Sequence, residues 1–291
     1  MPKDQQSIDP ELAGQFAECF RNLKEDDMPP YFDELIVNSA LQPGQIEIKA
    51  YPDDKNEIAF NIFAWEIGID WGDGNFENST YGKFRHKYPT RNLQTIKIDT
   101  IGLSQFNWNH SHCSVTTFRE LSFGICPKLK NINCSRVDLT SLSLSKCATL
   151  DWLDCCSNRL SFLDVSKCAD LVFLNCWSNH LTSLDISKCK ALNNLSCGRN
   201  ALTSVDVSKC TALIRFKCQE NEITSLDVST CTVLTELVCN NNQLSTSELN
   251  SLFNSLPERK PNDGAIINFR DNPGSDTCDK TIATKKGWAI N

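Results

Sequence analysis

The sequence predicts a solenoid of short right-handed coils with parallel β-strands, preceded by a β-sandwich and a short helical segment. The first observation is a cysteine pattern with a strict 21-residue period, and the second is a set of apolar residues that keeps the same period. The third is a change to alternating apolar and polar residues before the repeats. The two cysteine columns are Cys113, Cys134, Cys155, Cys176, Cys197, Cys218 and Cys239, and Cys126, Cys147, Cys168, Cys189, Cys210 and Cys231.

The repeated unit reads L-x-x-L-x-C-x-x-N-x-L-T-S-L-D-V-S-K-C-x-x. Its leucine columns include Leu150, Leu171 and Leu192, and its asparagine column is Asn158, Asn179, Asn200, Asn221 and Asn242. A period of roughly 20–29 residues with this pattern is the leucine-rich repeat signature. One unit cannot bury its own apolar face, so stacked coils form a continuous core.

The remaining segments give a four-part plan. Residues 1–40 read as a helical segment, residues 41–105 as a β-sandwich, residues 106–257 as the solenoid and residues 258–291 as a C-terminal cap. The strands expected in the sandwich are "QIEIKAY", "NEIAFNIFA", "IGIDW" and "TIKID", with a tight turn at Asp73-Gly74. A helix near Thr246–Leu256, capped by Ser245 and Glu248, is expected to interrupt the period, with Ile267 and Phe269 then taking the leucine positions.

The cysteines are expected to be buried core residues. The first column occupies an inward strand position, and a free cysteine behaves as a small buried hydrophobe. Zinc sites need four convergent ligands, commonly with C-x2-4-C spacing, whereas cysteines of the two columns lie farther apart along the chain, as Cys155, Cys168 and Cys176 show. Disulfides between neighbouring rungs are an alternative, although in-register strands hold the Cβ atoms farther apart than a bridge prefers. Cys156 is expected to point outward, and Cys19 and Cys278 lie outside both columns.

With these motifs on the page, the chain resembles the bacterial leucine-rich repeat proteins of the internalin J and Bacteroidota type. The 21-residue "LTSLDVSKC" units carry the resemblance, and the C-terminal tail is similar to that of the Bacteroidota members. The front segment resembles a PKD-like β-sandwich, through Trp71-Gly72-Asp73-Gly74 and His86-Lys87-Tyr88. The family implies extracellular adhesion or ligand binding, and no catalysis. Exported members begin with a signal peptide, and the N-terminus here has no apolar core of that kind. The chain as written is therefore expected to be cytoplasmic, or extracellular or at the cell surface if a leader was removed.

The candidate site lies on the outward positions of the predicted strands, which usually form the concave face of such solenoids. The first outward column runs from His110 through Asn131, Trp152, Phe173, Asn194 and Arg215 to Glu236. Trp152, Phe173 and Trp177 fall on adjacent coils, so they are expected to form an exposed aromatic patch flanked by Asp154, Asn175 and Arg215. Exposed aromatic clusters are typical of binding surfaces, and the ligand could be a protein or a glycan. The alternative is that the rings pack on one another and bind nothing.

The sequence gives little support for nucleic-acid binding, a membrane span, a metal site or catalysis. The net charge is −7, and there is no basic patch for nucleic acid and no apolar run long enough for a membrane span. His110 and His112 lack further ligands for a metal, and the turn explains Asp70 and Asp73 without calcium. No catalytic motif occurs, so no enzyme, metal or cofactor is expected.

These observations predict a non-enzymatic binding module that recognises a protein, or a glycan, through its concave face, in adhesion or host interaction. A PKD-like domain would serve as cap and spacer. One alternative is a cytoplasmic regulator, for example an immunity-type inhibitor of another protein. Another is a structural spacer with no ligand. The regular Asp164, Asp185, Asp206 and Asp227 and Lys146, Lys167, Lys188 and Lys209 columns are expected to be a solvated face with side-chain pairing along the stack.

Overall fold

The structure is a computed structural model, and it describes residues 44–291 except 53–55, 65, 80–81, 108–116 and 261–262. The chain divides into two compact units, Met1–Gln42 and Pro43–Asn291, and only the second is described here. The helices expected in residues 1–40 therefore lie outside the described residues, as do Cys19, His110, His112 and Cys113.

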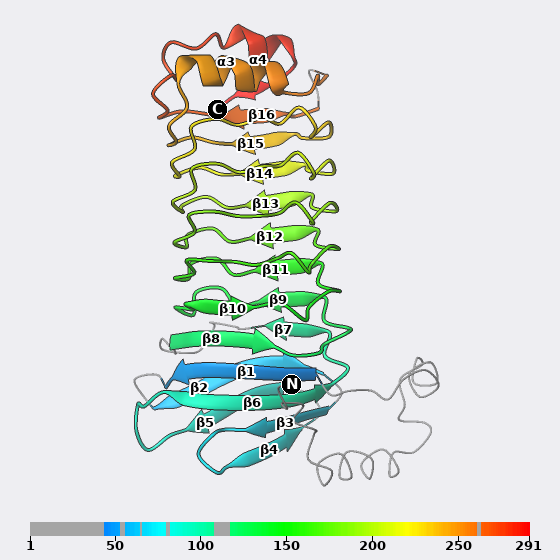
Figure 1. The fold of residues 1–291 in the computed structure, drawn as a ribbon, viewed down its shortest axis with the longest axis vertical. Coiled ribbons are helices and arrows are strands. Elements are labelled where there is room, and N and C mark those ends of the chain that lie inside the picture. Colours follow the sequence, from blue (N-terminus) through cyan, green and yellow to red (C-terminus); the bar gives the residue numbers. More distant parts are fainter. Residues whose placement is uncertain (1–43, 53–55, 65, 80–81, 108–116, 261–262) are drawn as a thin grey trace, which may run out of the picture. The chain divides into compact units, whose positions relative to one another are not determined.

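The repeats form a ladder of short parallel strands, stacked one above another (Figure 1). Partners in the central ladder are one repeat apart, as in the pairing of Leu153 with Leu174 and of Leu174 with Leu195. The predicted solenoid of parallel strands is thus confirmed. In order, the strands are β7 (Gln105–Asn107), β9 (Asn131–Asn133), β11 (Trp152–Asp154), β12 (Phe173–Asn175), β13 (Asn194–Ser196), β14 (Arg215–Lys217), β15 (Glu236–Val238), β16 (Ile266–Asn268) and β17 (Ala289–Ile290).

The N-terminal part of the described chain is built from longer, mostly antiparallel strands. Its elements are β1 (Gly44–Tyr51), β2 (Glu57–Phe63), β3 (Glu66–Asp70), β4 (Phe76–Ser79), β5 (Gly82–Lys87), β6 (Gln94–Ile101) and β8 (Thr117–Phe123). The four strands expected from the sequence correspond to β1, β2, β3 and β6. One sheet has the order β10-β8-β1-β6-β3-β4, in which β10 (Ser141–Ser143) belongs to the first repeats. The other sheet begins β5-β2-β7 and continues into the solenoid ladder.

The entry into the solenoid departs from the period. Phe106 of β7 pairs with Ile132 of β9, a longer separation along the chain than the repeat allows. The 21-residue step had placed His110 beside Asn131, whereas Gln105 takes that position. The first coil therefore carries an insertion relative to the later ones, and the expected pair of His110 and His112 lies outside the described residues. The shift arises because β7 also pairs antiparallel with β2, which fixes it to the N-terminal strands.

The turn between β3 and β4 is held by a small polar and aromatic cluster. Gly72 and Gly74 adopt φ values of +80° and +89°, a region that favours glycine, and the Gly72 N–H donates to Asp70 Oδ1 at 2.9 Å. His86 stacks on Trp71 at 4.9 Å between ring centroids, and its Nε2 lies 2.8 Å from Asp73 Oδ2. The buried Tyr88 hydroxyl donates to the Trp71 carbonyl at 2.9 Å.

We expect the Tyr88→Phe substitution to lower the free energy of unfolding by about 1–2 kcal/mol. The change removes one hydrogen bond and leaves the Trp71 carbonyl without this partner inside the protein. Chemical denaturation followed by tryptophan fluorescence measures the loss. The control is Tyr51→Phe, at a half-buried tyrosine of β1, which should change stability by less than about 0.5 kcal/mol. Equal stability of Tyr88→Phe and the parent would mean that this hydrogen bond contributes nothing.

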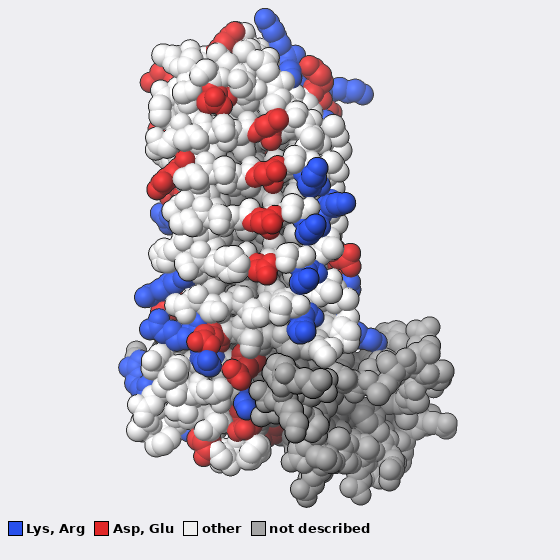
Figure 2. Space-filling view, in the orientation of Figure 1, with Lys and Arg blue, Asp and Glu red and all other residues white. Residues whose placement is uncertain are grey.

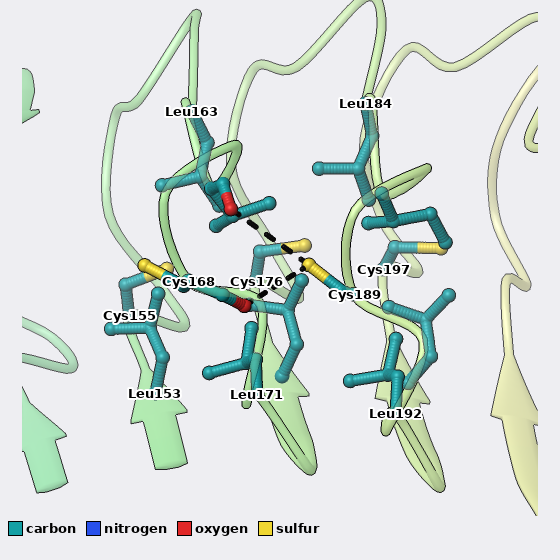
Figure 3. Packing of buried hydrophobic residues seen from close by; sticks show 14 of the residues in the cluster. Leu153, Cys155, Leu163, Cys168, Leu171, Cys176, Leu184, Cys189, Leu192 and Cys197 are labelled. Carbon is teal, nitrogen blue, oxygen red and sulfur yellow. Dashed lines mark hydrogen bonds between the residues drawn. The ribbon is translucent and has the colours of Figure 1, made fainter. Parts of the chain in front are cut away.

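The core of the solenoid alternates leucine and cysteine columns (Figure 3). All fourteen cysteines in the described part of the chain carry free thiols, and all of them are buried except Cys156, which is half-buried. The Cys189 thiol lies 3.6 Å from the Cys168 carbonyl oxygen and 3.8 Å from that of Val165, and Cys210 and Cys231 repeat this geometry. The second column thus contributes weak hydrogen bonds between coils as well as packing. These distances support the prediction that the thiols are core groups.

The asparagine column joins each coil to the one before it. Asn179 is representative: its Oδ1 accepts from the Leu160 N–H at 3.0 Å, and its Nδ2 donates to the Cys155 and Cys176 carbonyls, each at 3.1 Å. Asn158, Asn200, Asn221, Asn242 and Asn272 repeat this arrangement. Each amide therefore satisfies backbone groups of two coils where the chain turns away from the strand.

The residue before each of these asparagines has a left-handed backbone. Their φ values lie between +54° and +58°, although none is glycine: Ser157, Ser178, Arg199, Glu220, Asn241 and Asp271. An L-residue in this region carries a steric cost that glycine does not. The asparagine hydrogen bonds hold the chain in this strained geometry.

We expect Ser178→Gly to raise the free energy of unfolding by about 0.5–1 kcal/mol. Relief of the left-handed strain, worth about 1–2 kcal/mol, is partly offset by the greater freedom of glycine in the unfolded chain. Thermal or denaturant unfolding measures the gain. Ser183→Gly is the matched control, because Ser183 lies in the next turn of the repeat and has no positive φ; it should lose stability. A loss at both positions would contradict the strain argument.

The C-terminal end of the ladder is covered by α3 (Thr246–Ser255) and α4 (Thr281–Lys285) (Figure 1). Ser245 is the N-cap of α3, with its hydroxyl accepting from the Glu248 N–H, so the expected capped helix is confirmed. Ile267 takes the position of Leu237, as expected, whereas the buried Phe269 takes the position of Cys239, so its expected place on a leucine position was wrong. Trp288 is buried, and its indole N–H donates to the Pro257 carbonyl at 2.9 Å, which makes it a packing residue of the cap.

One surface of the solenoid carries regular columns of opposite charge, red and blue in Figure 2. Each aspartate of this surface accepts a hydrogen bond from the backbone N–H two residues later, as Asp185 does from Ser187 at 2.9 Å. Asp164, Asp206 and Asp227 do the same. The hydrogen bonds with Ser187 hold the pKa of the Asp185 carboxyl below its usual value. The aspartates therefore shape the turn of each coil, a role that the sequence had assigned to charge pairing.

Candidate functional site

The candidate site is the strand face, by which we mean the outward side chains of β9 and β11–β15 and the second and third residues after each strand. In the strands the central residue is buried and its two neighbours face outward, as the burial pattern of β11 and β12 shows. Residues one repeat apart are therefore neighbours on this face. The register confirms the column from Asn131 through Trp152, Phe173, Asn194 and Arg215 to Glu236.

Trp152 and Phe173 lie side by side on this face. Their ring centroids are 4.8 Å apart and the ring planes are inclined by only 7°, so the two rings are stacked along the solenoid axis. Both side chains are half-buried. Because each ring covers one face of the other, the pair presents mainly its edges to solvent. The rings do pack on one another, as the sequence alternative held, yet they remain accessible.

Trp177 is positioned by a different set of contacts. It lies one repeat before Gly198, where a Cβ atom would approach Trp177 Cδ1 to 2.9 Å and the Gln219 carbonyl oxygen to 2.8 Å. The Arg199 guanidinium lies over the indole ring, 5.1 Å from its centroid, and Arg199 Nε is 3.0 Å from Glu220 Oε2. The glycine thus provides the space for the ring, and the cation holds it.

The two polar residues expected beside the aromatic patch serve the backbone. Asp154 Oδ1 accepts from the Cys156 N–H at 3.0 Å, and Asn175 Oδ1 accepts from the Trp177 N–H at 3.3 Å. Both contacts end the strand in the same way. Each side chain is half-buried. Asp154 therefore brings a negative charge next to the aromatic pair.

Arg215 lies apart from the aromatic pair. Asn194 separates it from Phe173 in the column, and its Nε is 3.5 Å from Glu236 Oε2. Lys217 approaches the other oxygen of the same carboxylate, with Nζ 2.8 Å from Glu236 Oε1. The expected flanking arginine is thus part of an ion-pair group further along the face.

Two residues at the edge of the strand face, Arg199 and Glu220, were missed by the sequence reasoning. The signal that could have found the Arg199–Glu220 pair is the period itself, since the two residues are one repeat apart and carry opposite charges. Arg215 and Glu236 are related in the same way. The position of Arg199 over Trp177 depends on side-chain rotamers, for which the period holds no signal.

Cys156 is the half-buried thiol of this face. Burial, and then the Asp154 carboxylate, raise the pKa of Cys156 to about 11, so the thiol is protonated at neutral pH. A reactive cysteine needs the opposite environment. Across the described ranges, no three His, Cys, Asp or Glu side chains are grouped to hold a metal ion. No helix of the described chain has the length and apolar character of a membrane span.

No family model matches this chain, and no curated protein matches it. Among solved structures it is similar to the functional domain of InlJ from Listeria monocytogenes, which includes a cysteine ladder, at 25% identity over 64% of this chain and 49% of that one, with a TM-score of 0.34. It is also similar to a leucine-rich repeat protein of Leptospira interrogans, at 22% identity over 57% and 49% of the two chains, with a TM-score of 0.47. It is similar as well to internalin C2 of Listeria monocytogenes, at 19% identity over 52% of this chain and 77% of that one, with a TM-score of 0.36. The chain spans about half the length of the first two.

The repeat, the strand register and the buried thiols agree with one another. Partners one repeat apart stack leucine on leucine and cysteine on cysteine through the central coils. The chain is a leucine-rich repeat solenoid with a cysteine ladder.

Proposed function

We propose that the chain is a non-enzymatic binding module whose strand face recognises a protein partner. The observation that carries the proposal is the set of three large aromatic side chains, Trp152, Phe173 and Trp177, half-exposed on neighbouring coils. The solenoid does not need them there, because equivalent coils carry Asn131, Asn194 and Gly198 at these positions. Surface aromatics are enriched in protein interfaces, where one buried anchor is worth roughly 2–4 kcal/mol.

A protein ligand suits this face better than a glycan does. A sugar ring stacks on an open aromatic face, and Trp152 and Phe173 each have one face covered by the other. The guanidinium of Arg199 lies over the Trp177 ring. Ring edges and an ordered cation are better suited to the mixed apolar and polar surface of a protein. An adhesion or host-interaction role fits such a module and forms part of this proposal.

We further propose that the strands of residues 44–105 are a PKD-like domain that caps and spaces the solenoid. The Trp71, His86 and Tyr88 cluster around the Asp73 turn supports the resemblance. The pairing of β2 with β7 and of β1 with β8 supports a capping role, because β7 and β8 in turn pair with β9 and β10 of the first coils. A truncation that begins at residue 117 should then expose apolar core and aggregate, as measured by light scattering; a soluble, cooperative truncated protein would contradict it.

The experiment for the binding proposal is affinity capture with the intact chain, followed by mass spectrometry. A Trp152→Ser/Trp177→Ser variant removes two of the aromatic side chains, and Phe162→Ser removes an exposed aromatic side chain that lies outside the strand columns. All three proteins should first show the same circular dichroism spectrum. We expect a specific partner that is retained by the parent and by Phe162→Ser and lost by the double variant. Retention by the double variant would refute the proposed site. A partner that is itself an enzyme or toxin would favour the regulator alternative.

A further inference from the structure

The strand face has a surplus of positive charge at β14. Arg215 and Lys217 share a single carboxylate, that of Glu236, through its two oxygens at 3.5 and 2.8 Å. The Glu236 side chain is 20% exposed, whereas those of Arg215 and Lys217 are 61% and 39% exposed. The anion is therefore the inner member of the group, and the two cations reach toward solvent. One positive charge remains uncompensated within the group.

The rest of the face does not offset this charge locally. Arg199 and Glu220 form a pair of their own beside Trp177. Asp154 supplies a negative charge at β11, three coils away from β14. Parallel strands are about 4.8 Å apart, so these opposite charges are separated by roughly 14 Å. The aromatic pair of Trp152 and Phe173 lies at the negative end.

We propose that the strand face binds an extended protein segment that places an Asp or Glu carboxylate against Arg215 and Lys217. This inference rests on the proposed function and specifies the chemistry of the partner. A large apolar side chain of the segment contacts the Trp152–Phe173 pair, and the acidic group lies two coils further on. Asp154 repels an acidic group at the aromatic end of the face. The acidic end of the segment therefore lies at β14 and its apolar end at β11 and β12.

The spacing of the segment follows from the coil spacing. Phe173 and Arg215 are two coils apart, or about 10 Å, and an extended chain advances about 3.3 Å per residue. The acidic residue should therefore lie about three positions from the apolar anchor. The Arg215 guanidinium suits a carboxylate because it offers its donors in a planar fork, and Lys217 adds a second cation.

The test is selection from a displayed library of random peptides of about twelve residues, with the intact chain as bait. We expect the selected peptides to combine a large apolar residue with Asp or Glu about three positions away. The Arg215→Gln/Lys217→Gln variant should bind a selected peptide at least tenfold more weakly than the parent. The matched control, Lys188→Gln/Lys209→Gln, removes two cations from the surface with the charge columns and should change the affinity by less than twofold.

A charge-reversal variant, Arg215→Glu/Lys217→Glu, adds a gain-of-function arm. After a check of its fold by thermal unfolding, it should select peptides with Lys or Arg in place of the acidic residue. Selected peptides that need Trp152 but show no acidic preference would overturn this inference and leave the proposed function standing. Peptides whose affinity changes neither with substitution of Trp152 nor with substitution of Arg215 and Lys217 would overturn this inference and the proposed function together. A selection that yields no peptides at all would do the same.

Discussion

The protein should unfold steeply between about pH 9 and 10.5, and the transition should release on the order of ten protons. The cause is the pair of cysteine columns, which place twelve buried thiols in the described solenoid. Burial raises the pKa of Cys176, Cys189, Cys210 and Cys239 to about 12, and it raises that of Cys155 further. In the unfolded chain the same thiols titrate near pH 8.5.

The sign of the effect follows from proton linkage. Above pH 8.5 the unfolded chain loses thiol protons and the folded chain keeps them, so stability falls as pH rises toward the folded pKa values. At a pH one unit above the unfolded pKa, each buried thiol lowers the free energy of unfolding by about 1.4 kcal/mol. Twelve thiols together then cost on the order of 15 kcal/mol, which matches or exceeds the stability of most domains. Well below pH 8.5 the thiols are protonated in both the folded and the unfolded chain, so they no longer lower the free energy of unfolding.

The measurement is equilibrium unfolding at a series of pH values, with a reductant to prevent oxidation. The dependence of the unfolding constant on pH counts the protons released. The control is a triple Cys155→Val/Cys176→Val/Cys197→Val variant, which should release about three fewer protons and shift the midpoint upward. A transition linked to only one or two protons would show that the thiols ionise without unfolding.

The second large effect is expected at the asparagine column. Asn179→Leu should lower the free energy of unfolding by about 3 kcal/mol, because at a site that is only 6% exposed the Leu160 N–H loses its acceptor. The Cys155 and Cys176 carbonyls each lose one of two amide donors and keep the bonds from Asn158 and Asn200. The unsatisfied buried N–H costs roughly 1–3 kcal/mol, and each lost hydrogen bond to a carbonyl adds about 0.5–1.5 kcal/mol. Leucine cannot replace the amide at any of them. Denaturant unfolding measures the loss.

Two further variants make this prediction specific. His180→Ala changes the neighbouring exposed residue and should leave stability within about 0.5 kcal/mol of the parent. Asn179→Asp keeps the acceptor for the Leu160 N–H but turns a charge toward two carbonyl oxygens. It should therefore be destabilised at pH 7 and recover in part as the carboxyl is protonated. A loss below about 1 kcal/mol for Asn179→Leu would mean that water replaces the amide.

The sequence alone determined the central solenoid of this protein. A strict 21-residue period fixes which residues become neighbours, because every coil must bury the same apolar positions against the next one. The stacking of Leu153 on Leu174, the burial of Cys176 and the outward position of Trp152 all follow from it. The N-cap at Ser245 follows instead from a local capping pattern where the period is interrupted.

Only the tertiary structure decided the features that depart from the period. Phe106 is aligned with Ile132 because β7 is also held by β2, a long-range contact that no repeat encodes. Trp177 lies beneath Arg199 because Gly198 leaves room for the ring, and the shared carboxylate of Glu236 depends on the rotamers of Arg215 and Lys217. Periodicity determines which residues are adjacent, whereas packing and charge determine how their side chains meet.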